Sequence, residues 1–293
     1  MFPIQKIVQR APEYPDVLKE IHDPPKQLFA RGNSSLLNNH TLLAIVGTRK
    51  CSTYGRSATQ RIVEELRSTN AVIVSGLAFG IDAAAHKAAL ENSLPTIAVL
   101  GGSVDDTSIY PQTNKGLATK ILEKGGLIIS EYETGTETFP SNFLNRNRII
   151  AGISQGTLVV EAPIKSGALS TARHALNSNR SVYAIPGNIS SRLSTGTNYL
   201  IQQGAMCVTT AQDIISDLPL ELLTEREQQD ISILSPDEQH LIHILESSST
   251  PLHINTIIQT TNWENQKVVS TLLSLVLGNY ITEVEQNSYQ RIP

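Results

Sequence analysis

From position 42 onward, short apolar runs alternate with longer segments in which apolar residues recur at helical spacing. The apolar runs are Leu42–Gly47, Ala71–Ser75, Thr96–Leu100, Leu127–Ser130, Thr157–Glu161, Val182–Ile185 and Met206–Val208. The helical segments are Tyr54–Ser68, Ile81–Asn92, Thr113–Lys124, Asn142–Ile153, Ala168–Asn177 and Asn198–Gln203. Uniformly apolar runs are typical of strands that helices cover on both faces. The pattern predicts an α/β fold built of βαβ units around a parallel sheet.

The regions on either side of this core have a different character. Residues 1–40 are rich in Pro and Asn and are expected to form a lead segment with a short helix at Asp16–Ile21, packing on a core of residues 41–217. Residues 218–234 are mixed and acidic and are predicted to be a linker. In residues 235–293, the predicted helices and strand-like runs are Asp237–Ser247, Ile254–Thr260, Glu264–Leu277, Tyr280–Glu283 and Tyr289–Ile292. That order resembles a small winged-helix domain.

Charge is distributed unevenly along the chain. The 293 residues include 23 Lys and Arg and 27 Asp and Glu, a formal net charge of −4. Counted by segment, residues 1–30 are neutral, residues 31–213 carry +4 and residues 214–293 carry −8. A polyanionic partner should therefore meet the middle of the chain, and the C-terminal segment should repel it.

Composition excludes several classes of protein. Hydrophobic residues make up 40% of the chain and charged residues 17%, which argues against intrinsic disorder, collagen and coiled coils. Cys51 and Cys207 lack the spacing of a disulfide framework or a zinc site, so a reducing compartment is expected. The first residues lack a signal-peptide pattern, and no apolar run approaches the length that spans a bilayer. We therefore expect a cytoplasmic protein without a membrane partner.

Glycine recurs where the predicted strands end. Ligands of parallel sheets bind beyond the carboxyl ends of the strands, and free N–H groups at helix starts attract phosphate. The candidate residues in these loops are Gly47, Thr48, Arg49, Ser75, Gly76, Gly80, Asp82, Gly101, Lys165, Ser166 and Gly167. A single glycine-rich turn can be purely steric, but five such loops together favour a composite phosphate-binding site.

Cations and aromatic residues accompany these loops. Arg49, Lys115, Arg146, Arg148 and Lys165 are the candidate cations, and Phe139 and Phe143 precede the Arg146-Asn147-Arg148 triplet. Cations beside aromatic rings suit single-stranded nucleic acid, whose phosphates follow the charge and whose bases stack on rings. The alternatives are a solvated helix face for the two arginines of the triplet, and core packing for the phenylalanines.

Evidence for catalysis is sparse. The chain has neither a G-x-x-x-x-G-K-[ST] motif nor a G-x-G-x-x-G motif after the first strand, which argues against a P-loop ATPase and against dinucleotide use. Asp82 and His86 have the i, i+4 spacing of an acid–base pair, but a cap or a helix-surface hydrogen bond explains them more simply. His240 and His243 lack a third ligand. We expect no metal and no cofactor.

Several segments together resemble the DprA/Smf family of bacterial DNA-processing proteins. The matching segments are AIVGTR at Ala44–Arg49, SGLAFGIDAAAHKAAL at Ser75–Leu90, Tyr110-Pro111-x-x-Asn114, Ser130-Glu131, RNRIIAGIS at Arg146–Ser154, LVVEAPIKSGALSTA at Leu158–Ala172, AIPG at Ala184–Gly187 and LIQQGA at Leu200–Ala205. The resemblance covers about residues 12–213. It implies an extended Rossmann-like domain that binds single-stranded DNA, forms a homodimer and loads the RecA recombinase in natural transformation, without catalysis.

The resemblance also implies roles for particular residues. Arg49 and Lys115, which follows Pro111 and Asn114, resemble the main phosphate-contacting cations of the family. The Ser75–Asp82 turn and Lys165-Ser166-Gly167 resemble the rest of the backbone cradle, while the RNR triplet either touches DNA or braces that cradle. The acidic C-terminal segment is then expected to be a protein-interaction or regulatory module rather than a DNA reader.

Two other functions remain as alternatives. A Rossmann-type phosphoribohydrolase would use the same sheet, but such enzymes resemble P-G-G-x-G-T-x-x-E in the fifth loop, and the Lys165–Thr171 segment has no glutamate there. A nucleotide-sensing module with the C-terminal domain as its output is the second alternative.

Overall fold

The computed structural model describes residues 2–38, 40–221, 234–246, 248, 251–261, 263–278, 280–285 and 287–291. The chain divides into two compact units, residues 1–222 and residues 223–293. Most of the expected linker, residues 222–233, lies outside the described residues. Its described beginning packs on the first unit, because Leu218 and Leu220 are buried and Thr41 Oγ1 donates to the carbonyl of Pro219.

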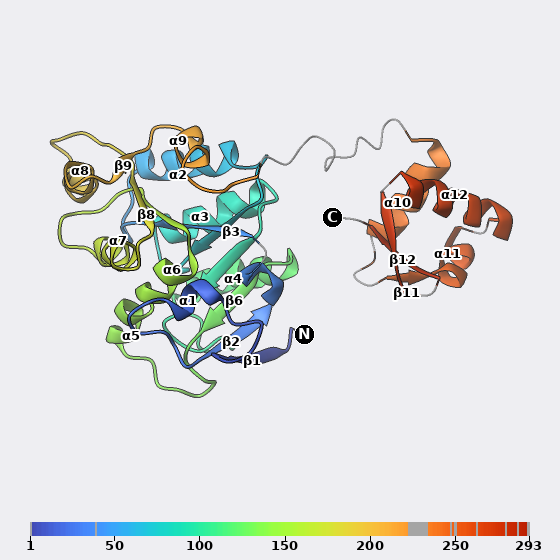
Figure 1. Ribbon diagram of the computed structural model, residues 1–293, viewed down its shortest axis with the longest axis horizontal. Helices are drawn as coiled ribbons and strands as arrows, with labels where there is room; N and C mark the ends of the chain where they lie inside the picture. Colours follow the sequence, from blue (N-terminus) through green and yellow to red (C-terminus); the bar gives the residue numbers. More distant parts are fainter. Residues whose placement is uncertain are drawn as a thin grey trace. The chain divides into compact units, whose positions relative to one another are not determined.

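The first unit is built on one nine-stranded sheet (Figure 1). Its strand order is β1-β2-β6-β5-β4-β3-β7-β8-β9. The strands are β1 (Ile4–Val8), β2 (Gln27–Gly32), β3 (Thr41–Val46), β4 (Ala71–Ser75), β5 (Thr96–Val99), β6 (Leu127–Ser130), β7 (Gly156–Val159), β8 (Ser181–Ala184) and β9 (Met206–Cys207). Strands β3 to β9 pair in parallel, as the alternating pattern predicts.

Helices cover both faces of this sheet (Figure 1). One layer contains α1 (Asp16–Lys19), α6 (Asn147–Ile153), α7 (Gly167–Asn177) and α8 (Thr195–Gln202). The other contains α2 (Thr53–Glu65), α3 (Ile81–Glu91), α4 (Lys115–Glu123) and α9 (Ala211–Ile215). Along β3, Leu42, Ala44 and Val46 face the first layer while Leu43 and Ile45 face the second. Both faces of the strand are apolar because both are covered.

The lead segment adds an antiparallel edge that the sequence pattern did not predict. β1 and β2 form an antiparallel pair, and β2 continues the sheet by pairing antiparallel with β6. In β1 only Ile7 is buried, so the hydrophobic pattern of this edge strand is too weak to predict a strand. Short 3-10 turns occur at Ser34–Leu37, Gln112–Asn114 and Arg192–Ser194.

One predicted helix is divided in two. The segment expected as a helix over 142–153 forms α5 (Pro140–Asn145) and α6, with Arg146 between them. Arg146 keeps helical backbone angles, its N–H donates to the carbonyl of Asn142, and its own carbonyl accepts from the N–H of Ile150. The two helices therefore follow one another with little interruption.

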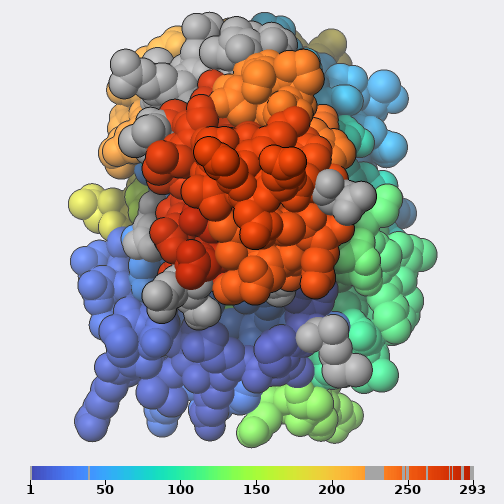
Figure 2. All heavy atoms as spheres, turned by 90° about the vertical axis from the view of Figure 1, so that its right-hand side faces the viewer, coloured from blue at the N-terminus to red at the C-terminus, as the bar shows by residue number. Residues whose placement is uncertain are grey.

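The second unit is a separate small α/β body. Its elements are α10 (Pro236–Glu246), β10 (Leu252–His253), α11 (Ile254–Thr261), α12 (Asn265–Leu277), β11 (Ile281–Glu285) and β12 (Ser288–Arg291). The three strands form an antiparallel sheet in the order β10-β12-β11. Leu241, Ile257 and Leu272 bring the three helices onto one apolar core, and the unit forms a closely packed body (Figure 2). The winged-helix type remains a prediction.

Candidate functional site

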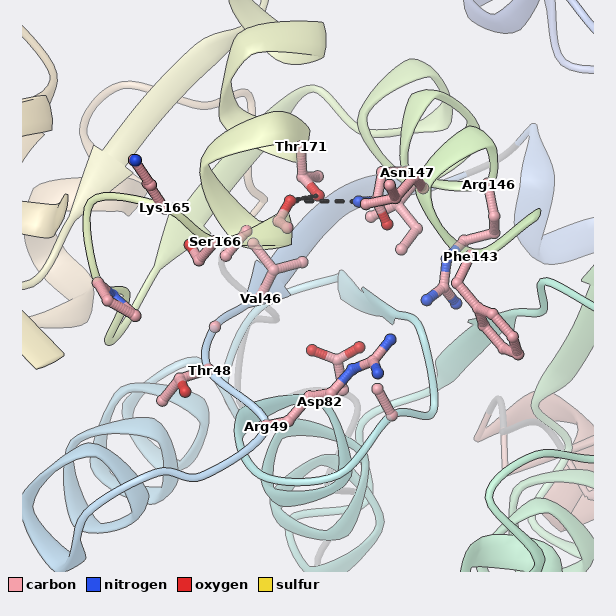
Figure 3. Close-up of a pocket in the computed structure, with 17 residues that line it drawn as sticks. Val46, Thr48, Arg49, Asp82, Phe143, Arg146, Asn147, Lys165, Ser166 and Thr171 are labelled. Atoms are coloured by element: carbon pink, nitrogen blue, oxygen red, sulfur yellow. Dashed lines mark hydrogen bonds between the residues drawn. The ribbon is translucent and has the colours of Figure 1, made fainter. Parts of the chain in front are cut away.

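The sheet changes its winding direction beside β3. From β3 the chain proceeds through β4, β5 and β6 in one direction, while β7, β8 and β9 follow on the other side. At such a point the loops after neighbouring strands diverge and leave a crevice. A cavity of about 380 Å³ lies there, lined by loop Gly47–Arg49, by Ala78 and Asp82, by α5 and α6, and by Pro163–Thr171 (Figure 3). We call it the central cavity.

Hydrogen bonds to Glu161, just after β7, hold the loop after β3. The N–H of Thr48 donates to the carbonyl of Glu161 over 2.7 Å. The Glu161 carboxylate is buried, and it accepts hydrogen bonds from the N–H and hydroxyl of Ser52, over 2.8 Å and 2.5 Å. Because Ser52 also caps α2, this carboxylate ties the helix and the loop to the neighbouring strand.

The loop after β4 is strained and clamped. Leu77 has φ +56° and Gly80 φ +77°, and a Cβ on Gly80 would meet the carbonyl oxygen of Thr48. Glycine is therefore required at position 80 for both backbone conformation and close approach. The amide nitrogen of Asn114 donates to the carbonyls of Leu77 and Ala78, over 2.9 Å and 3.3 Å. Asn114 thus holds the loop in shape.

Arg146 lies in the interior rather than on an open surface. Its guanidinium donates to the carbonyls of Gly76 and Val99, so it joins the ends of β4 and β5. Burial lowers the pKa of Arg146 to about 10, which leaves the side chain charged. Burial raises the pKa of Asp82, and the charge of Arg146 opposes that effect. Asp82 accepts from the N–H of Gly76, so both side chains brace the wall of the central cavity.

Three other predicted interface residues are placed elsewhere. Ser75 is fully buried, and its hydroxyl donates to the carbonyl of Ile45, so a polymer cannot reach it. Gly101 is buried as well, where a Cβ would lie 2.7 Å from the Phe143 ring. Arg148 pairs with Glu131 over 2.6 Å and with Asp23 over 3.2 Å. These ion pairs favour the second role expected for Arg148, that of bracing the cradle, and a contact with DNA stays a prediction.

Two cations remain available at the central cavity. Arg49 and Lys165 are exposed, and neither pairs with a carboxylate among the described residues. They come from the loops after β3 and β7, and Figure 3 places them on different sides of the cavity. The Arg49 guanidinium lies 6.0 Å from the ring centroid of Phe143. This arrangement presents positive charge and an aromatic ring to the same space.

The first turn of α7 forms another wall. The Ser166 hydroxyl accepts from the N–H of Leu169, and Thr171 Oγ1 donates to the carbonyl of Gly167. The Asn147 amide also donates to that carbonyl over 3.2 Å (Figure 3). Asn147 therefore positions the glycine at the start of the helix rather than pointing to solvent.

The structure gathers ten of the predicted residues around this cavity. They are Gly47, Thr48, Arg49, Asp82, Phe143, Arg146, Asn147, Lys165, Ser166 and Gly167. Gly76 and Pro111 line a small adjoining cavity. Lys115 begins α4 outside the central cavity, and Phe139 is half exposed and does not line it. Thr171 also lines the cavity and was not predicted, because its only sequence signal is its position four residues after Gly167.

The possible acid–base pair does not form. Asp82 accepts from the Gly76 N–H, whereas His86 Nδ1 lies 2.7 Å from Thr96 Oγ1. Since the Thr96 hydroxyl donates to the carbonyl of Ile73, it accepts from His86. Burial, followed by the charge of Arg146, lowers the pKa of His86 to about 3. A neutral, enclosed imidazole of this kind has a structural role.

The described residues show neither a metal-binding cluster nor a membrane-spanning helix. They contain no group of three or more His, Cys, Asp or Glu side chains that could hold a metal ion. No helix in this part of the chain is long and apolar enough to cross a membrane.

The fold and the cavity define a class of protein. It is a doubly wound α/β protein that presents cations and helix starts where the strand order reverses. Residues 5–219 match the family model of DNA recombination-mediator protein A. The chain belongs to this family, which confirms the resemblance to DprA/Smf proteins.

Individual relatives agree with this assignment. The chain is 38% identical over 278 residues to Protein Smf of Escherichia coli, covering 92% of this chain and 73% of that protein. It is 45% identical over 204 residues to DNA processing protein DprA of Streptococcus pneumoniae, covering 70% and 71%.

Two solved structures are similar. The crystal structure of the Streptococcus pneumoniae DprA matches with a TM-score of 0.69 at 42% identity, over 75% of each chain. DNA processing protein A of Helicobacter pylori matches with a TM-score of 0.65 at 33% identity, over 73% of this chain and 95% of that one. That structure was described for a unique single-stranded DNA binding mode of the Helicobacter pylori protein.

Proposed function

We propose that this protein binds single-stranded DNA in the central cavity and acts as a recombination mediator in natural transformation. The proposal rests on two cations, Arg49 and Lys165, that form no ion pair with any described residue and lie on loops that meet where the strand order reverses. A relative that covers most of the same fold is described as binding single-stranded DNA. The similarity supports the choice of ligand, and the two cations support the central cavity as its site.

The physical mechanism is non-specific capture of the sugar–phosphate backbone. Arg49 and Lys165 neutralise phosphates, and the backbone of Gly47, Thr48 and Gly167 approaches closely because these residues are small. Phe143, which already contacts the Arg49 guanidinium, offers a ring for base stacking worth about 1–3 kcal/mol. Neutralisation of phosphates does not depend on the DNA sequence. For each phosphate neutralised, the log of the binding affinity falls by about 0.7 for each log unit of salt concentration.

Further parts of the function rest on the family. We propose that the protein forms a homodimer, transfers the strand to the RecA recombinase and acts in the cytoplasm without catalysis. Lys115 and Phe139 are proposed as contacts for the strand outside the central cavity. The C-terminal unit, whose segment carries the excess of acidic residues, is proposed as a protein-interaction module.

The two rival functions are less well supported. A phosphoribohydrolase needs a catalytic acid near the loop after β7, and the central cavity is lined there by Lys165, Ser166 and Thr171. Asp82 lies in the cavity wall, but its carboxylate is bonded to the Gly76 N–H. A nucleotide sensor would bind a free nucleotide more tightly than a polymer.

The experiment compares ligands on the full-length protein. Fluorescence anisotropy with labelled oligo-dT is competed by unlabelled oligo-dT, by duplex DNA of equal length and by nucleoside monophosphates, with free base measured in the last case. The proposal requires that oligo-dT competes best and that no base is released. Preferential binding of a monophosphate, or release of base, would overturn it.

A further inference from the structure

A second cavity lies on the far side of the loop after β4. It measures about 280 Å³ and is bounded by α2, by α3 and by Phe79 and Gly80 of that loop. Asn114, which clamps the loop, also lines it. Along α3 its floor is made by alanines, Ala83, Ala84 and Ala88, whose short side chains leave the space between the two helices open. We call it the α2–α3 groove.

The described residues that line the α2–α3 groove carry one more positive than negative charge. Arg56 and Lys87 are exposed cations on its two walls. Neither forms an ion pair within the described residues, and the Arg56 guanidinium contacts only the Cys51 sulfur, over 3.9 Å. Glu91 is the one acidic side chain among the described lining residues. An anion in this groove would meet two cations from facing helices.

A small third cavity adjoins both the groove and the central cavity. It shares Arg49, Ala78 and Phe143 with the central cavity, and it shares Phe79 with the α2–α3 groove. The Phe79 side chain is 43% exposed, although it follows a fully buried strand and a tightly clamped loop. An aromatic ring held at the junction of two cationic cavities has the properties of a stacking platform for a base.

We propose that the α2–α3 groove holds a second segment of the same DNA strand after it leaves the central cavity. Phe79 stacks a base at the crossing, and Arg56 and Lys87 neutralise the phosphates that follow. This inference rests on the proposed function, because the central cavity supplies the first segment. It adds a binding site and a direction for the strand, from the loop after β3, across the loop after β4, to the α2–α3 surface.

The proposal predicts a dependence on strand length. An oligonucleotide of about 6 nucleotides occupies the central cavity alone, whereas one of about 20 nucleotides also reaches the groove. The double variant Arg56→Gln, Lys87→Gln should therefore weaken binding of the long strand only. A plot of log affinity for the long strand against log salt concentration should be less steep for this double variant than for the wild type, by about 1.4, because two fewer phosphates are neutralised. Phe79→Ala should weaken the long strand at least 5-fold.

Controls separate this site from general charge and from the central cavity. Arg61→Gln removes an exposed arginine from the same helix, at a position outside the groove, and should change neither strand. Arg49→Gln should weaken both strands equally. The substituted cations are exposed, so thermal unfolding should show the wild-type transition for each of these variants.

The outcomes are distinguishable. If the wild type binds neither oligonucleotide, the proposed function fails and the groove proposal with it. If Arg49→Gln weakens both strands while the groove variants bind the long strand as the wild type does, the central site stands and the groove proposal is overturned. Length-selective loss at Arg56, Lys87 and Phe79, with Arg61→Gln unchanged, supports it.

Discussion

Replacing Gly80 by alanine should change the shape of the central cavity, although Gly80 does not line it. A Cβ at this position would contact the carbonyl oxygen of Thr48 and would lie 2.7 Å and 2.8 Å from the carbonyl carbon and oxygen of Arg49. These atoms belong to backbone, which cannot swing aside as a flexible side chain can. The substitution must therefore displace the loop that carries Arg49.

Two other glycines serve as references that separate the effect of backbone conformation from the effect of close contact on the free energy of unfolding. Gly116 lies within α4 with nothing within 4 Å of an added Cβ, so Gly116→Ala should stabilise by about 0.5–1 kcal/mol. Gly125 has φ +74° and equally open surroundings, so Gly125→Ala should cost about 1 kcal/mol from conformation alone. Gly80→Ala combines φ +77° with the backbone contacts and should cost about 3 kcal/mol. Its affinity for oligo-dT should also fall about 10-fold, the equivalent of one charged hydrogen bond.

Circular dichroism during urea unfolding measures these stabilities, and the chain carries its own control. Its one tryptophan, Trp263, belongs to the second unit, so tryptophan fluorescence reports on that unit separately. Gly80→Ala should lower the circular dichroism midpoint and leave the fluorescence midpoint in place. If Gly80→Ala costs no more than Gly125→Ala and retains wild-type affinity for oligo-dT, the close approach between the two loops does not shape the site.

Three further substitutions test separate parts of the structure. Asn114→Ala should cost about 2 kcal/mol in urea unfolding for two lost hydrogen bonds, and Asn114→Asp should cost more, because a carboxylate would then face two carbonyl oxygens. His86 is buried and neutral, so the stability that it contributes is fully present above its unfolded pKa of about 6.5 and is lost as the pH falls toward 3. The free energy of unfolding should therefore drop by about 2 kcal/mol between pH 7.5 and pH 5. The variant His86→Gln should not show this drop. Arg148→Gln should destabilise by about 2 kcal/mol by leaving Glu131 unpaired, while oligo-dT affinity stays unchanged in anisotropy titrations; weaker binding at wild-type stability would restore Arg148 to the interface.

The parallel sheet could be predicted because its strands are short, apolar and separated by helices of regular length. The strands at Ala71–Ser75 and Leu127–Ser130 have the predicted bounds. The antiparallel edge was missed because the two faces of β1 differ little, and its membership of the sheet depends on pairing with β2, a tertiary contact. Local patterns carry no information of that kind.

The sequence indicated which types of residue follow the strands, but it did not indicate which of their side chains are buried. Glycine and basic residues in the loops after the strands line the central cavity, because parallel strands bring their carboxyl ends to one edge of the sheet. Sequence does not show whether an arginine turns outward or inward. Arg146 and Arg148 are two residues apart, yet one holds backbone carbonyls and the other holds carboxylates. Phe79 was missed for the same reason, since its exposure depends on the clamped loop beneath it.

In the proposed function, Arg49 and Lys165 bind the phosphates of an unpaired strand. The most direct test measures oligo-dT affinity of the full-length protein across a series of salt concentrations, for the wild type, for Arg49→Gln with Lys165→Gln, and for the control Arg61→Gln. A plot of log affinity against log salt concentration should be less steep for the double variant than for the wild type, by about 1.4, and the control should match the wild type. An unchanged slope in the double variant would contradict the proposed function.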